Sequence, residues 1–216
     1  MKKIIINQNK IYGDVAKYFS STLISQGITP LGVGWNGEES QIKRFEQLCK
    51  IINTTSSFSI NDLGCGYGAL FDFLAERYNS FSYMGFDVSE RMIQTASLRY
   101  KNEGQVKFFI SAKPEQIADY GVASGIFNLS FGCSVVEWFI HLETTLDTLN
   151  DTSRFGFVFN CLTSYSDVEK MRDDLYYADP CQLFDLCKRR YSKNVALLHD
   201  YGLYDFTILV RKENNL

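Results

Sequence analysis

The 216-residue chain contains only three prolines and two histidines, and none of its six cysteines forms a C-x-x-C pair. So little proline excludes a collagen-like fibre. The two histidines, His141 and His199, lie far apart and the cysteines are scattered, so no zinc site is predicted and we expect no bound metal. Scattered, reduced thiols are typical of a cytoplasmic protein.

Long apolar runs and an excess of one charge are also missing. No apolar stretch approaches the roughly 20 residues of a membrane helix. Residues 1–7 hold three apolar residues in a row, fewer than the ~7–15 of a secretion signal. The 22 basic and 25 acidic residues leave a net charge of −3, which argues against a nucleic-acid partner held through many phosphates. We therefore expect a cytoplasmic protein that binds neither membrane nor nucleic acid.

What is present is an ordinary globular composition with many aromatic residues. Hydrophobic residues make up 45% of the chain and charged residues 22%, which is typical of a soluble protein. A chain of this length buries about 70% of its unfolded surface, so it suits one domain, alone or with a cap. The aromatic content of 15% is high; it fits either an aromatic core or a pocket lined by ring faces.

A polar stretch at residues 53–59 divides the sequence into two regions. Before it, residues 14–50 show helical spacing of apolar residues, interrupted by a turn-rich segment at 27–34. After it, short apolar segments alternate with amphipathic ones. We expect an N-terminal helical cap over residues 1–56 and an α/β domain over residues 57–216, packed as one compact unit.

The second region predicts a mostly parallel sheet. Strands are expected at residues 59–63, 83–87, 106–110, 120–124, 155–161, 195–199 and 207–210. Helices are expected at residues 69–78, 89–100 and 135–149, with a short one near 114–118. Their alternation with strands predicts helices on both faces of the sheet. Only residues 200–206 join the last two strands, and a parallel crossover needs about a dozen residues, so the final strand should run antiparallel to the one before it.

The sharpest local signal is a glycine-rich turn at residues 62–68, between an expected strand and an expected helix. Gly64 permits a tight turn because it has no Cβ, and Gly66 lets the backbone approach a ligand closely. Asp87 ends the next strand, nineteen residues after Gly68. An acid at this place accepts hydrogen bonds from the ribose hydroxyls of an adenosine group.

Three interpretations compete for this pair of signals. Gly64-x-Gly66-x-x-Ala69 also fits the loose dinucleotide fingerprint, which would indicate an NAD-dependent oxidoreductase. A non-catalytic adenosyl-binding protein is the third possibility. Three features disfavour the dinucleotide alternative: Asp62 stands two residues before the turn, a long region precedes the first strand, and the last strand pair is expected to be antiparallel.

The segments DLGCGYG at residues 62–68 and GFDVSERMI at residues 85–93 resemble those of the class I S-adenosylmethionine-dependent methyltransferases. The resemblance extends over residues 60–211. It implies a Rossmann-like α/β fold with a seven-stranded, mostly parallel sheet and an antiparallel last strand. It also implies methyl transfer from S-adenosylmethionine, with S-adenosylhomocysteine as the product.

The resemblance further implies where the cofactor lies. Gly64 and Gly66 would lie under its methionine end, with Asp62 near the amino group. Asp87 would hold the ribose, and Ala112, after the third strand, would contact the adenine.

Other candidates stand around this site. Ser124, after the fourth strand, would flank cofactor and substrate, as would Phe127, for which a core position is the alternative. Trp35 lies among turn residues and would close over the pocket against the substrate. Arg44 would form a bidentate pair with the methionine carboxylate, or would lie on the surface of an amphipathic helix.

We expect the substrate to be covered by a lid at about residues 162–194, since long insertions at this sheet edge commonly form caps. Within it, Tyr177 would contact the substrate. The basic run at residues 188–190 would meet phosphate or lie solvated at a helix end. His199, at the mouth between the last strands, would act as general base near neutral pH, or would be a hydrogen-bonded strand-end histidine.

The acceptor is expected to be a small molecule methylated on oxygen or nitrogen. Composition typical of low-GC bacteria, and similarity of residues 35–45 and 197–204 to bacterial enzymes that modify surface sugars, favour a sugar, a phosphate or another metabolite of surface polysaccharide synthesis. A monomer and a homodimer are equally compatible with the sequence.

Overall fold

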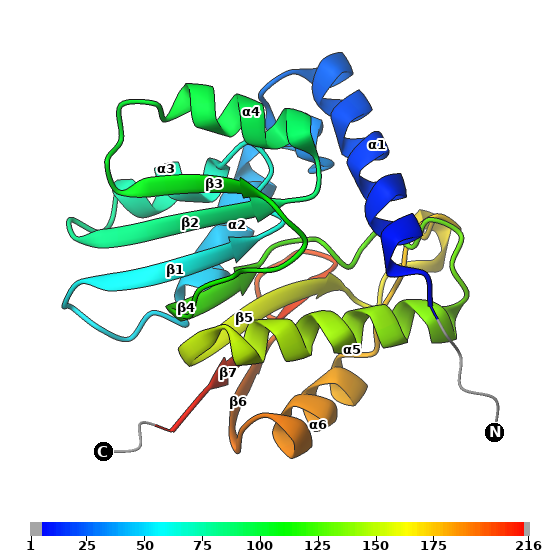
Figure 1. The fold of residues 1–216 in the computed structure, drawn as a ribbon. Helices are drawn as coiled ribbons and strands as arrows, with labels where there is room; N and C mark the ends of the chain where they lie inside the picture. Colours follow the sequence, from blue (N-terminus) through cyan, green and yellow to red (C-terminus); the bar gives the residue numbers. More distant parts are fainter. Residues whose placement is uncertain (1–5, 214–216) are drawn as a thin grey trace.

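The computed structural model describes residues 6–213. Residues 1–5, which belong to the stretch whose short apolar run argued against a secretion signal, lie outside the described residues. A seven-stranded sheet forms the centre, in the order β3-β2-β1-β4-β5-β7-β6 (Figure 1). Its strands are β1 Phe58–Leu63, β2 Phe81–Asp87, β3 Val106–Ile110, β4 Ala118–Ala123, β5 Ser153–Leu162, β6 Asn194–Leu198 and β7 Asp205–Arg211. Neighbouring strands from β3 to β5 pair in parallel, and β7 is antiparallel to both its neighbours. The expected Rossmann-like sheet with an antiparallel last strand is confirmed.

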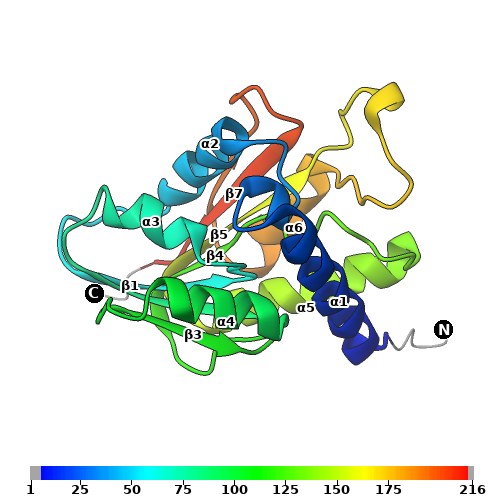
Figure 2. The ribbon, with the colours of Figure 1, turned by 90° about the horizontal axis from the view of Figure 1, so that it is seen from above.

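Helices cover both faces of this sheet. They are α1 Gln8–Gln26, α2 Glu38–Cys49, α3 Ala69–Ala75, α4 Glu90–Arg99, α5 Val135–Asp151 and α6 Pro180–Arg190, with the short 3₁₀ helices η1 Pro30–Val33 and η2 Val168–Lys170. In Figure 1, α2 and α3 lie behind the sheet and α5 and α6 lie in front of it. The view from above in Figure 2 separates α2 and α3 on one side of the strands from α5 on the other.

The central strands are buried on both sides and feed two cores. Successive residues of a strand point to opposite faces. In β5, Val158 packs with Leu48 of α2 on one face, while Phe157 and Phe159 pack with Leu146 of α5 on the other. All five side chains are completely buried. Strands covered on both faces therefore read as continuous apolar runs, which is why the sequence locates them well.

The two N-terminal helices, α1 and α2, lie at different places on the sheet. Phe45 and Leu48 of α2 belong to the same core as α3, so this helix shares its core with the α/β region. In contrast, α1 crosses the carboxyl ends of the strands (blue in Figures 1 and 2). Its Ser20 hydroxyl lies 2.9 Å from that of Ser89, which caps α4. The expected boundary at residue 56 falls in the irregular segment between α2 and β1.

One expected helix is not formed. Residues 111–117 make an irregular loop that leads directly into β4. The Ser111 hydroxyl donates to the Lys113 carbonyl at 2.7 Å and accepts from the Lys113 N–H at 3.2 Å. These local bonds engage backbone groups that a helix would use. The prediction of a short helix near residues 114–118 is therefore wrong, and Ala112 lies in a loop at the edge of the sheet.

Candidate active site

A cavity of about 1060 Å³, its mouth included, opens at the carboxyl ends of β1, β2 and β4. This is the edge at which open α/β sheets bind ligands. The turn after β1 and the loops after β2 and β4 line one side, and α1 and α5 line the other.

The turn after β1 depends on glycine. The N–H of Gly64 donates to the Phe86 carbonyl at 2.7 Å, and the N–H of Gly66 donates to Asp87 Oδ2 at 3.0 Å. Gly64 has φ +76°, a conformation in which a Cβ is strained, and a Cβ there would lie 2.2 Å from Cγ2 of Ile126. Both glycines line the cavity, so the turn presents bare backbone to it.

Asp87 ends β2 and lines the cavity in a fixed orientation. Its Oδ1 accepts from the Ser89 N–H at 2.8 Å, and its Oδ2 accepts the Gly66 bond described above. Burial raises the pKa of this carboxyl, while the backbone N–H groups of Ser89 and Gly66 work against the shift. Because each carboxylate oxygen has two acceptor sites, Asp87 keeps capacity for hydroxyl donors in the cavity.

Asp62 is a second buried acid of the cavity. Its side chain is held by the Tyr83 hydroxyl, which donates to Oδ2. Burial raises the pKa of Asp62 to about 7; the Tyr83 bond opposes the rise and the charge of Asp87 adds to it. No Lys or Arg of residues 6–213 lines the cavity. Two acids without a nearby cation fit a ligand that is itself positively charged, because such a ligand offsets the cost of their burial.

Trp35 covers part of the cavity and is clamped from both sides. Its ring packs against Gly125, where a Cβ would lie 2.2 Å from ring atom Cη2. On the other side, the Arg44 guanidinium lies 4.0 Å from the ring centre. Arg44 forms a buried ion pair with Asp205 at 2.5 Å and donates to the Ser40 carbonyl at 2.8 Å. The structure therefore places Arg44 behind Trp35 and outside the cavity.

Two further predicted residues line the cavity and one does not. Ala112 and Ser124 are part of the lining, and the Ser124 Oγ is buried without a hydrogen-bond partner among the described residues. Phe127 is completely buried, with its ring 5.8 Å from that of Phe159 in the α5–α6 core. That position leaves Phe127 no side-chain surface for a ligand.

Tyr177 and His199 also lie outside the cavity lining. The Tyr177 hydroxyl accepts the Arg172 N–H at 3.0 Å and so ties the segment after β5 to itself. His199 is exposed after β6, with its ring 6.1 Å from that of Tyr165. The reason is the sheet order: β6 is the outermost strand, separated from β4 by β5 and β7.

The side of the cavity formed by α1 and α5 was not anticipated. Tyr12, Val15 and Phe19 face it at helical spacing, and His141 and Thr145 face it from α5. The available signal was the same periodicity, extended to the true start of α1 at Gln8. We expected this helix only from residue 14. In addition, the apolar stripe of a helix does not indicate which ligand or element the helix covers.

Comparisons with known proteins show the family to which this chain belongs. Residues 60–154 match the family described as "Methyltransferase domain". Rv1506c of Mycobacterium tuberculosis, whose name assigns it to the methyltransferases, is 62% identical over 163 residues, which is 76% of this chain and 98% of that protein. The chain belongs to the class I S-adenosylmethionine-dependent methyltransferases.

Solved methyltransferase structures share this fold at low sequence identity. A DhpI–SAH complex has a TM-score of 0.67 at 11% identity, over 97% of this chain and 100% of that one. Magnesium protoporphyrin IX methyltransferase from Synechocystis PCC 6803, with bound SAH, has a TM-score of 0.66 at 12% identity, over 94% and 99%. Within residues 6–213, no helix has both the length and the apolar character to cross a membrane.

Proposed function

We propose that this methyltransferase binds S-adenosylmethionine across the carboxyl ends of β1, β2 and β4 and methylates an oxygen or nitrogen of a small molecule held in the same cavity. One observation carries the proposal. A glycine turn and two oriented, buried acids, Asp62 and Asp87, meet in a cavity that no described Lys or Arg side chain lines.

The residues present fit the cofactor. Asp87 would hold the ribose hydroxyls, and Asp62 would lie by the amino group. The bare backbone at Gly64 and Gly66 would receive the methionine end, and Ala112 would lie against the adenine. When bound, S-adenosylmethionine supplies an electrophilic methyl group on a positively charged sulfur, which suits the two acids.

The chain's own contribution is alignment and exclusion of water. α1 closes the cavity on one side through Tyr12, Val15 and Phe19, and Trp35 is fixed over it. Correct placement of two reactants is worth about 7–11 kcal/mol of barrier. Since the methyl group arrives already activated, this alignment is the main catalytic requirement.

Residues 162–194 act in this proposal as a cover for the acceptor side. The Tyr176 N–H donates to the Asn128 carbonyl at 2.8 Å, and Leu175 forms an isolated bridge with Leu129, which lines the cavity. The segment thus supports the cavity wall from outside. Tyr177 serves within it as an internal support.

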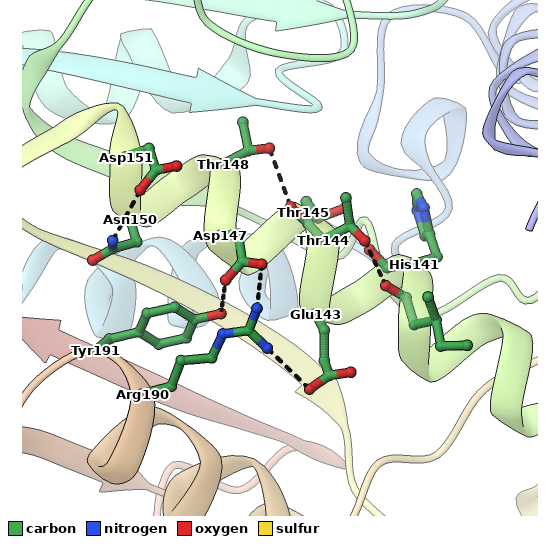
Figure 3. Close-up of polar contacts among 11 residues, drawn as sticks. His141, Glu143, Thr144, Thr145, Asp147, Thr148, Asn150, Asp151, Arg190 and Tyr191 are labelled. Carbon is green, nitrogen blue, oxygen red and sulfur yellow. Dashed lines mark hydrogen bonds and ion pairs between the residues drawn. The ribbon is translucent and has the colours of Figure 1, made fainter. Parts of the chain in front are cut away.

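The nature of the acceptor remains a prediction from the sequence. For a phosphate acceptor, the basic run at residues 188–190 offers little. Arg190 pairs with Glu143 and Asp147 of α5 at 3.2 and 2.5 Å (Figure 3). Arg189 pairs with Asp185. A small acceptor, rather than a nucleic acid, is supported by the mainly apolar lining of the cavity and the net charge of −3. The proposal includes a cytoplasmic protein, as a monomer or a homodimer.

Calorimetric titration with S-adenosylmethionine and S-adenosylhomocysteine tests the proposal. Both should bind with one site per chain. Asp87→Ala should weaken binding by about 1–3 kcal/mol because it leaves hydrogen-bonding hydroxyls unpaired. Asp185→Ala, on the outer helix α6, is the matched control and should bind as the wild type does. Absence of binding to either nucleoside would refute the proposed function.

A further inference from the structure

The cavity has two distinct ends, because α1 spans it. Near its C-terminal end, α1 contacts the start of α4 through Ser20 and Ser89. Near its N-terminal end, Gln8 contacts His141 of α5. Twelve residues of helix separate Gln8 from Ser20, about 18 Å. The cofactor acids belong to the sheet side, so the space between the first half of α1 and α5 is left for the acceptor.

The acceptor end is lined mainly by apolar and aromatic side chains. Tyr12 comes from α1, and Leu129 and Phe131 come from the loop after β4. Phe131 has φ +50° and is the sole non-glycine residue with positive φ in the part of the chain described. Such backbone strain collects at functional sites. Here it holds an aromatic ring in the wall, 5.9 Å from the ring of Tyr18.

His141 is a polar group of this end that has a hydrogen-bonding nitrogen to spare. Its Nδ1 lies 2.7 Å from Oε1 of Gln8. A carbonyl oxygen only accepts, so Nδ1 carries the proton and Nε2 carries the lone pair. The ring is fixed between Tyr12 at 5.8 Å and Trp138 at 4.9 Å. Within residues 6–213, Nε2 has no hydrogen-bond partner.

Among residues 6–213, no charged side chain forms a hydrogen bond or an ion pair with the His141 ring. Figure 3 shows that Glu143 and Asp147 point to the opposite side of α5, where Arg190 pairs with both. The groups packed on the ring are Gln8 and Tyr12 from α1 and Trp138 from its own helix, of which only Tyr12 titrates. Burial without a counter-charge lowers the pKa of His141 to about 4, so the ring is neutral at physiological pH.

The same walls select against charged acceptors. The charged side chains of the cavity are Asp62 and Asp87, both acidic, and no described Lys or Arg lines it. An anion would therefore meet repulsion and lose its hydration without a partner. A cation would find no carboxylate at the acceptor end. The lining fits an uncharged molecule with a large apolar surface and one hydrogen-bonding group.

We propose that the acceptor is an uncharged, mainly apolar hydroxyl compound, such as a phenol, and that Nε2 of His141 accepts the proton of its hydroxyl group. This inference rests on the proposed function and assigns the acceptor chemistry of that site. Gln8 is the positioning residue, because it fixes which nitrogen of His141 carries the lone pair.

The proton and the electron pairs balance in this step. A lone pair of the acceptor oxygen forms the new O–C bond to the methyl group. The electron pair of the breaking S–C bond stays on the sulfur, and the hydroxyl proton passes to Nε2 of His141 and then to solvent. A weakly basic imidazole suffices, because the hydroxyl becomes strongly acidic only as its oxygen bonds to carbon.

Binding of three matched probes to the protein saturated with S-adenosylhomocysteine tests the inference without turnover. The probes are 2-naphthol, 2-methoxynaphthalene with its hydroxyl blocked, and the dianion 2-naphthyl phosphate. NMR follows the ring protons of the two histidines of the chain, assigned with His199→Gln. Naphthol should bind and shift the His141 signals. Methoxynaphthalene should bind roughly tenfold more weakly than naphthol, because it has no hydroxyl to donate. The phosphate should bind no more tightly than methoxynaphthalene.

His141→Phe sharpens this test because it keeps an aromatic ring and removes Nε2. In that variant the naphthol and methoxynaphthalene affinities should become equal, whereas His199→Gln should keep the wild-type difference. Gln8→Leu should reduce the difference, and Gln8→Glu, which keeps a carbonyl-type acceptor, should restore it.

Several results would overturn the inference. They are equal or tighter binding of the phosphate, no binding of naphthol to the S-adenosylhomocysteine complex, a naphthol-induced shift of His199 alone, or a His141 titration midpoint above pH 6. Calorimetry with S-adenosylhomocysteine on the same samples separates the two proposals. If that nucleoside binds and the probe pattern fails, only the acceptor inference is lost; if it does not bind, the proposed function is lost.

Discussion

The Arg44 guanidinium lies 4.0 Å from the centre of the Trp35 indole and forms an ion pair with Asp205 at 2.5 Å. Both charged side chains are buried, with 7% and 1% of their surface exposed. Arg44 thus joins α2 to β7 and fixes the ring that covers the cavity. From the sequence we expected this guanidinium either on the methionine carboxylate of the cofactor or on the surface of an amphipathic helix; in the structure it is buried and its carboxylate partner is Asp205.

Arg44→Ala should destabilise the protein strongly. The substitution leaves the buried Asp205 carboxylate without its partner, and breaking a buried pair in this way costs about 3–5 kcal/mol. Urea unfolding measures the loss. The matched control is Arg189→Ala, which removes an ion pair with Asp185 between side chains 79% and 58% exposed. Exposed pairs contribute little, so the control should unfold at the wild-type urea concentration. Similar midpoints for the two variants would contradict the role given to Arg44.

Binding of a positively charged nucleoside should release a proton from Asp62. In the free protein burial raises the pKa of Asp62 to about 7, so part of the population is protonated at neutral pH. A cation beside the carboxyl lowers its pKa and drives the proton off. Calorimetric titration at pH 7 with S-adenosylmethionine, in buffers of different ionisation enthalpy, measures the number of protons released.

Asp62→Asn provides the control for this proton release, because an amide has the same shape and no proton to lose. The variant should bind S-adenosylmethionine without buffer-dependent heat. Proton uptake in the wild type, or an unchanged release in the variant, would show that Asp62 does not face the cationic part of the ligand.

The contribution of His141 to the stability of the protein should fall as the pH drops from 6.5 to 4. In this window the unfolded chain protonates His141 at an ordinary pKa near 6.5, whereas burial lowers the pKa of the folded side chain to about 4. At this side chain the unfolded state therefore binds more protons, and its contribution to stability rises with pH by up to about 3 kcal/mol across the window. The raised pKa of Asp62 acts in the opposite direction in the same window. Urea unfolding at a series of pH values measures the slope.

The difference between the wild-type and His141→Phe stabilities should isolate this contribution, because the variant has no imidazole to protonate at that position. His199→Gln, at the exposed histidine, should keep the wild-type slope. If the two substitutions changed the slope equally, the buried environment of His141 would not be its source.

Much of the fold follows from local features of the sequence. The middle of β5, residues 155–159, is an apolar run because helices cover both faces of the sheet. The short link between β6 and β7, residues 199–204 in the structure, allows only an antiparallel pairing of the two strands. The glycine turn and Asp87 have a fixed spacing along the chain, so they too were found. Each of these signals lies within a short stretch of residues.

The acceptor end was missed because it is made of contacts between distant parts of the chain. Gln8 and His141 are 133 positions apart, and neither belongs to a pattern that indicates the other. His199 attracted attention as a histidine next to an aspartate, but the connection from β5 through α6 to the outermost strand β6 places it at the far edge of the sheet. Phe127 and Arg44 show the same limit. An aromatic ring and a guanidinium are both suited to bind a ligand, and the sequence does not indicate that Phe159 and Asp205 are their partners in the core.

The contact between Trp35 and Gly125 gives the sharpest substitution test of the cavity. Gly125 has φ +71° and Gly132 has φ +72°, so an alanine at either position meets the same backbone strain, about 1–2 kcal/mol. At Gly132 no atom lies within 4 Å of the added Cβ, but at Gly125 the Trp35 ring lies 2.2 Å away. The difference between the two variants therefore isolates the displacement of the ring.

Gly125→Ala should lose about 1–3 kcal/mol more than Gly132→Ala, the usual cost of an overpacked site. It should also move Trp35 away from the cavity and into solvent, which shifts the fluorescence of this ring to longer wavelength. The change can be assigned to Trp35 because the chain's other tryptophan, Trp138, is completely buried. Nucleoside binding should weaken in Gly125→Ala and not in Gly132→Ala. Equal stability, emission and affinity in the two variants would mean that Trp35 moves freely over the cavity, and that the clamp formed with Arg44 does not set its position.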